Sequence, residues 1–95
     1  MKKLTSTEVL INGTWIEKEG DVYGDEACKR IEWLTENVLE KLANSREFGA
    51  WETLFRDPED GRLWERFYPH GEMHGGGPPA LRVIGETDAR CKYDY

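Results

Sequence analysis

Two aromatic-rich segments on either side of a short turn restrict the fold of this chain more than any other feature. Residues Ala50–Arg56 and Arg62–Tyr68 alternate apolar and polar side chains, and the sequence DPEDG at Asp57–Gly61 separates them. Proline presets the backbone for a turn, and glycine supplies the left-handed position after it. The pattern predicts a β-hairpin with one face on a core and the other partly open. The three acidic residues of the turn lack the spacing of a calcium loop, so we interpret them as turn residues.

A periodic apolar run precedes the hairpin. Its residues follow one another at steps of 4, 3, 4 and 4: Ala27, Ile31, Leu34, Val38 and Leu42. This spacing is typical of one face of an α-helix and predicts a helix from about Glu26 to about Ala43, ended by Asn44-Ser45. Asp25 or its neighbour is expected to cap it, because a short acidic side chain accepts from unpaired backbone N–H groups.

The remaining elements are short. Residues 9–16 are predicted to form a strand with a bend or bulge at Asn12-Gly13, paired in a hairpin with Val22-Tyr23 after a turn at Glu19–Asp21. We expect another strand at Leu81–Ile84 and a short helix over residues 86–93. The predicted order is β-β-α-β-β-β-α. The fold class expected from it is α+β, a small antiparallel sheet covered by one long helix.

The chain of 95 residues contains no repeat and no Ser/Pro-rich linker, so we expect a single domain over residues 1–95. No apolar stretch approaches the roughly 18 residues that a membrane span needs, and no membrane association is expected. Two lysines follow Met1 without an apolar run after them, so a secretory signal is not expected. These features predict a cytoplasmic protein.

The acidic charge balance restricts the class of partner. There are 13 Lys and Arg residues against 19 Asp and Glu residues, a formal net charge of −6. A phosphate backbone would be repelled, so no nucleic-acid partner is expected. Such a surface favours basic partners and speeds the encounter with them, although acidic charge also serves solubility alone.

The segment His70-Gly71-Glu72-Met73-His74 permits two interpretations. Two imidazoles flanking a carboxylate suggest a metal-binding or catalytic site, and a small metal-dependent enzyme is one alternative function. The spacing departs from the zinc-protease pattern, in which Glu directly follows the first His on a helix. An exposed loop explains the same residues, and we predict no metal, no cofactor and no catalytic residue.

The glycines of the next segment, Gly75, Gly76 and Gly77, precede Pro78-Pro79. They indicate a tight backbone passage that leads into the last strand, or a binding loop that a partner approaches closely, and both can hold.

Trp33 is the candidate anchor of a partner-binding surface. In the predicted helix it lies off the apolar face, among Glu32, Glu36 and Glu40, which are like charges at i, i+4 spacing. An aromatic side chain ringed by carboxylates is typical of an interface with a basic partner. The alternative is that a terminal arm or the glycine loop covers Trp33. Secondary candidates are Glu59 and Asp60 at the hairpin tip and the loop formed by His74, Gly75, Gly76 and Gly77.

The chain resembles the immunity protein 27 family of bacterial polymorphic toxin systems. The resemblance rests on residues 49–69 and 73–81, on 8–15, and on 30–34, with the combination of Trp-Glu pairs and Gly-Gly-Gly-Pro-Pro as its most distinctive part. It implies a small cytoplasmic α+β protein that binds and blocks a cognate toxin domain by occlusion, without indicating the class of toxin. The acidic charge makes a basic nuclease one candidate. The resemblance implies no catalytic residues. The alternatives are the metal-dependent enzyme above and a generic acidic adaptor without a toxin partner.

Overall fold

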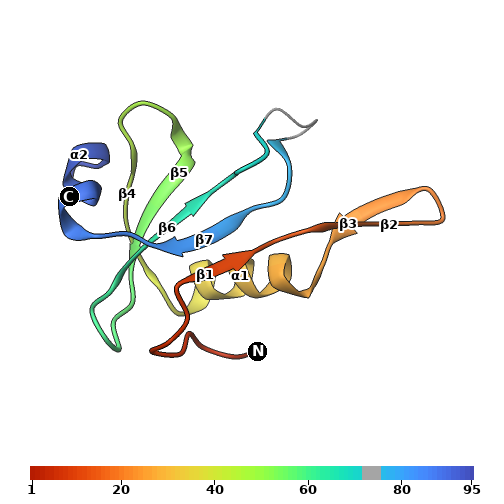
Figure 1. Ribbon diagram of the computed structural model, residues 1–95, viewed down its shortest axis with the longest axis horizontal. Coiled ribbons are helices and arrows are strands. Elements are labelled where there is room, and N and C mark those ends of the chain that lie inside the picture. Colours follow the sequence, from red (N-terminus) through yellow and green to blue (C-terminus); the bar gives the residue numbers. More distant parts are fainter. Residues whose placement is uncertain (72–75) are drawn as a thin grey trace.

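Antiparallel strands are the predominant secondary structure of the molecule (Figure 1). The computed structural model describes residues 1–71 and 76–95. Within these residues seven strands and two helices follow the order β-β-β-α-β-β-β-β-α. They are β1 (Leu10–Asn12), β2 (Trp15–Lys18), β3 (Asp21–Gly24), α1 (Glu26–Asn37), β4 (Glu40–Ser45), β5 (Gly49–Arg56), β6 (Leu63–Phe67), β7 (Ala80–Val83) and α2 (Glu86–Lys92). Neither helix is long and apolar enough to cross a bilayer.

The strands form two separate sheets. Five of them make the main sheet in the order β1-β7-β6-β5-β4, and β2 pairs only with β3. The β2–β3 pair, called the ribbon below, extends away from the main sheet (Figure 1). The first predicted hairpin is therefore correct only for this ribbon, with Glu19 and Gly20 at positive φ in its turn.

Gly13 divides residues 9–16, which were predicted to form one strand, between β1 and β2. Its N–H donates to the carbonyl of Pro79 at 2.8 Å, and a Cβ at this position would stand 2.4 Å from that oxygen. Residues before Gly13 pair with β7, whereas residues after it pair with β3. The close approach to Pro79 turns the chain out of the main sheet.

The prediction of one long helix covering a small sheet is wrong. Asp25 caps α1 as expected, accepting from the Cys28 N–H at 2.9 Å, but the helix ends at Asn37. Residues 40–45 form β4 instead, which pairs with β5. Apolar residues continue at helical spacing through Leu42, but pairing with a long neighbouring strand overrides this local preference. The α+β class remains, as a sheet-dominated fold with two short helices.

The two helices pack on opposite faces of the main sheet. Successive strand residues point to opposite faces. Phe55 therefore packs in the core with α1, while Leu54 packs with α2. Leu34 is fully buried, as predicted. The larger core cluster consists of Leu4, Ile11, Ile31, Leu34, Leu39, Phe55, Trp64 and Leu81.

The β5–β6 hairpin is the element that the sequence predicts best. Its strands pair antiparallel, with Phe55 opposite Trp64, and Gly61 takes the left-handed conformation at φ 77°. Asp57 is buried, and its Oδ1 accepts from the Glu59 N–H at 2.9 Å. The interpretation of Asp57–Gly61 as a turn is confirmed.

Candidate functional site

Trp51 and Tyr68 form an exposed aromatic pair at the open end of the β5–β6 hairpin. Their ring centroids lie 5.2 Å apart, and the ring planes meet at 81°. Thr53 pairs with Arg66 across the hairpin. Two residues further along each strand, Trp51 therefore lies opposite Tyr68. Both rings are on the face of the sheet that α1 partly covers. Trp51 is 54% exposed, which is unusual for so large an aromatic side chain.

A hollow of about 380 Å³, called the aromatic pocket below, adjoins this pair. Phe48, 53% exposed, stands at its edge, so two large aromatic side chains are open to solvent at one place. Pockets with mostly aromatic walls and one charged group are typical of binding sites. The residues that line it are Phe48, Trp51, Glu52, Phe67, Tyr68 and Gly71.

A second hollow, of about 450 Å³, lies beside α1 and is called the helix groove below. Glu32 and Glu36 border it from the helix, and Lys41 and Arg66 from the sheet. In the part of the chain that the structure describes, none of these four side chains forms an ion pair. Tyr68 lines both hollows, so the groove and the aromatic pocket form one surface, the groove–pocket surface.

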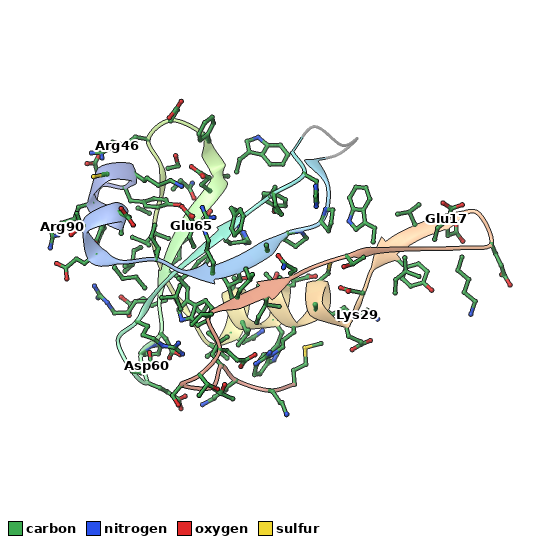
Figure 2. All side chains as sticks on the ribbon, viewed as in Figure 1. Glu17, Lys29, Arg46, Asp60, Glu65 and Arg90 are labelled. Atoms are coloured by element: carbon green, nitrogen blue, oxygen red, sulfur yellow. The ribbon has the colours of Figure 1, made fainter. Side chains whose placement is uncertain are left out.

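A buried charge cluster fixes the Glu52 carboxylate. Lys92 donates to Glu52 Oε2 at 2.7 Å and lies 2.5 Å from Glu65 Oε2. Glu65 is fully buried and also accepts from the Tyr93 hydroxyl at 2.6 Å and from Arg82 Nε at 2.9 Å. Burial alone would raise the pKa of Glu65, but these three donors outweigh it and hold its pKa below the ordinary value. The cluster ties α2 to the main sheet next to the pocket; Figure 2 shows Glu65 in that sheet, far from Glu17 on the ribbon.

Gly76 supports the Trp51 ring. It is buried at φ 88°, and a Cβ there would stand 2.4 Å from Trp51 Cζ3. At Gly77, with φ 75°, a Cβ would stand 2.7 Å from the His70 carbonyl oxygen. The predicted tight backbone passage is confirmed at both glycines. Their role in binding a partner stays a prediction, and His74 and Gly75 lie outside the described residues.

Trp33 does not lie on an exposed acidic surface, contrary to the prediction from the sequence. It is half-buried and packs against the larger core cluster. Glu32 and Glu36 border the helix groove, whereas Glu40 belongs to β4, so the three carboxylates do not share one helical face. Trp51 and Tyr68 are candidate site residues that were not among those predicted from the sequence. The signal was present in the aromatic alternation of the hairpin, whose open face was predicted without being assigned a function.

The remaining candidates are the two acidic residues at the hairpin tip, which form ion pairs within the chain, and the segment 70–74, which lies partly outside the described residues. Glu59 pairs with Lys3 at 3.3 Å, and Asp60 pairs with Arg62 at 2.6 Å. Of the proposed metal-binding segment, Glu72 and His74 fall outside the described residues. Among residues 1–71 and 76–95, no group of three or more His, Cys, Asp or Glu side chains is placed to hold a metal ion.

The chain matches the model of a known protein family. A family model described as immunity protein 27 matches residues 17–85, which is more than half of the chain and includes the whole groove–pocket surface except Trp15. No curated protein matches the chain, and no solved structure matches it.

Proposed function

The chain belongs to the immunity protein 27 family, and from this premise we propose that it neutralises a cognate bacterial toxin domain by binding it and covering its functional surface. The family match over residues 17–85 is the observation that carries this function. Inhibition by occlusion needs no catalytic group on the inhibitor, only a complementary surface. The proposed site of action is the cytoplasm of the producing cell.

The groove–pocket surface is the proposed contact with the toxin. Interfaces concentrate their binding energy in a few aromatic side chains near the centre of the contact. Trp51 and Phe48 provide such side chains, already exposed in the free protein. Trp51 is held from two sides, by Tyr68 and by the backbone of Gly76, so little conformational freedom is lost when a partner covers it.

The charge of the protein suggests a basic toxin. The protein carries a formal net charge of −6, although in the helix groove itself Glu32 and Glu36 face the cations Lys41 and Arg66. The net charge of the whole protein steers a basic partner into contact. A toxin that acts on nucleic acid must itself be basic, which makes a nuclease the favoured class.

The test uses the product of the neighbouring gene, because the resemblance to polymorphic toxin systems implies that the cognate toxin is encoded there. We expect the purified chain to form a complex with that toxin and its expression to rescue the growth of cells that make the toxin. Trp51→Ala should weaken the complex, whereas Tyr23→Ala, a change at a 44% exposed aromatic residue on the ribbon, should not. Absence of any complex with the neighbouring toxin would contradict the proposal and favour the generic acidic adaptor.

A further inference from the structure

The aromatic pocket has the composition of a receptor for a flat cation. Four of its six lining residues are aromatic, and the one charged residue is Glu52. Aromatic ring faces attract cations, and the attraction grows where water is excluded. The rings of Phe48 and Trp51 carry no stacked cation from the described part of the chain.

Glu52 supplies an acceptor that the described residues leave unused. Its Oε2 accepts from Lys92 at 2.7 Å, while its Oε1 is buried without a hydrogen-bond partner among residues 1–71 and 76–95. A buried acceptor without a donor is unfavourable, and a charged N–H group is the strongest donor available to it. Lys92 pairs with both Glu52 and Glu65, and Arg82 also pairs with Glu65, so what remains at Glu52 is the unused acceptor Oε1 rather than an excess of charge.

Among the described residues, cations of the chain lie over aromatic rings at five places, four of them arginine and one the Lys92 ammonium, 5.9 Å from the Tyr93 centroid. Guanidinium groups lie over aromatic rings at four places, with distances from Cζ to the ring centroid between 3.9 and 5.6 Å. The shortest is that of Arg82 on Phe67, a residue that lines the pocket. A guanidinium is planar, so it can stack on a ring and still donate from its edge to a carboxylate, which an ammonium cannot do in the same way.

We propose that the aromatic pocket receives one arginine side chain of the toxin, stacked on Trp51 and Phe48 with its N–H groups directed to Glu52. This assignment of the partner's chemistry rests on the proposed function. A hollow of about 380 Å³ holds one such side chain, and the acidic charge of the protein favours its approach.

The experiment titrates the whole isotope-labelled protein with N-acetyl-arginine N-methylamide, followed by NMR. The matched probe is the citrulline analogue, which has nearly the same shape but carries a neutral urea group, and a lysine analogue is the second comparison. We expect saturable shifts of the Trp51 indole N–H and of the Gly71 amide. Arginine should bind roughly fivefold or more tightly than citrulline, the ratio that a cation–π contact with a charged hydrogen bond supplies.

Variants separate the pocket from the rest of the surface. Glu52→Gln keeps the shape and the contact with Lys92, and it should bring arginine binding close to that of citrulline. Phe48→Leu should weaken arginine binding, whereas Tyr23→Leu on the ribbon should leave it unchanged. If Phe48→Leu lowers the melting temperature, the isosteric Glu52→Gln variant still decides the question.

Several outcomes would overturn the inference: equal binding of arginine and citrulline, tighter binding of lysine, shifts confined to the helix groove, or no saturable shift. The proposed function is tested separately. If the wild-type protein binds its toxin and Glu52→Gln leaves that affinity unchanged, the arginine assignment fails while the function stands. If the wild-type protein binds no toxin, the function fails, and the titration then reports only the chemistry of the pocket.

Discussion

The backbone of Gly76 lies against the indole ring of Trp51, so close that a Cβ at residue 76 would stand 2.4 Å from ring atom Cζ3. This contact joins the glycine-rich segment to the exposed aromatic pair. A side chain at residue 76 would have to displace the ring, because the ring is rigid and Tyr68 packs against it as well. The glycine therefore sets the position of the side chain that we place at the centre of the toxin contact.

The first expectation compares Gly76→Ala with Gly20→Ala. Both glycines have a positive φ, 88° and 84°, so both substitutions incur the same backbone strain of about 1 kcal/mol. Nothing lies within 4 Å of a Cβ at Gly20. Gly76→Ala should therefore lower the free energy of unfolding by a further 1–3 kcal/mol or so and weaken toxin binding. Equal effects in chemical denaturation and in binding would show that the contact with Trp51 is unimportant.

The second expectation concerns Trp51. Trp51→Ala should weaken toxin binding by about 2 kcal/mol or more with little change in melting temperature, because Trp51 is 54% exposed. Calorimetric titration and thermal unfolding of the same sample measure the two effects. A large loss of stability with unchanged affinity would move the interface away from the aromatic pocket.

The third expectation concerns Trp33, which packs against the larger core cluster. Trp33→Ala should lower the free energy of unfolding by about 1–3 kcal/mol, and Leu34→Ala, at a fully buried residue, by about 2–5 kcal/mol. The affinity of the folded fraction for the toxin should stay the same in both. An unchanged melting temperature with weakened binding for Trp33→Ala would restore Trp33 as the anchor.

The fourth expectation tests the buried charge cluster. Glu65→Gln removes the charge that Lys92 and Arg82 face, and should cost about 2 kcal/mol or more of stability. Tyr93→Phe should cost about 1–2 kcal/mol, since it removes the 2.6 Å hydrogen bond to Glu65. The control is Tyr95→Phe, at an exposed residue. Urea unfolding curves that agree for all three variants would contradict the role of the cluster.

The fifth expectation is a pH dependence set by Glu8. Arg30 donates to both of its carboxylate oxygens, at 2.7 and 2.8 Å, and these hydrogen bonds lower the pKa of Glu8 from 4.5 to about 2. The unfolded chain therefore binds the proton more readily than the folded one. The stability that the pair contributes is fully present above pH 4.5 and is lost as the pH falls from 4.5 to about 2.

Glu8→Gln should accordingly flatten the dependence of the unfolding free energy on pH within this window. Glu26→Gln is the matched control, because the Glu26 side chain is 86% exposed and pairs only with Lys29, at 3.4 Å, among the described residues. The measurement is urea unfolding at a series of pH values. A curve for Glu8→Gln that runs parallel to that of the wild type would refute the assignment.

Several local elements were predictable from residues close together in the sequence, and the family was predictable from motifs along the chain. Asp57–Gly61 determines its turn through proline and glycine, Asp25 caps α1 through its own side chain, and helical spacing places Leu34 in the core. Each of these depends on interactions within a few residues. The acidic charge and the resemblance to the immunity protein family likewise need no tertiary information.

Only the tertiary structure decided where α1 ends, where the first strand divides and which tryptophan is exposed. Residues 40–43 suit a helix or a strand by their spacing, and β5 pairs with this segment as a strand. Gly13 divides its segment because Pro79 lies beside it, and Gly76 fixes Trp51 from 25 residues away in the sequence. These outcomes depend on contacts between distant segments, whose free energies outweigh local preferences of a few tenths of a kcal/mol per residue.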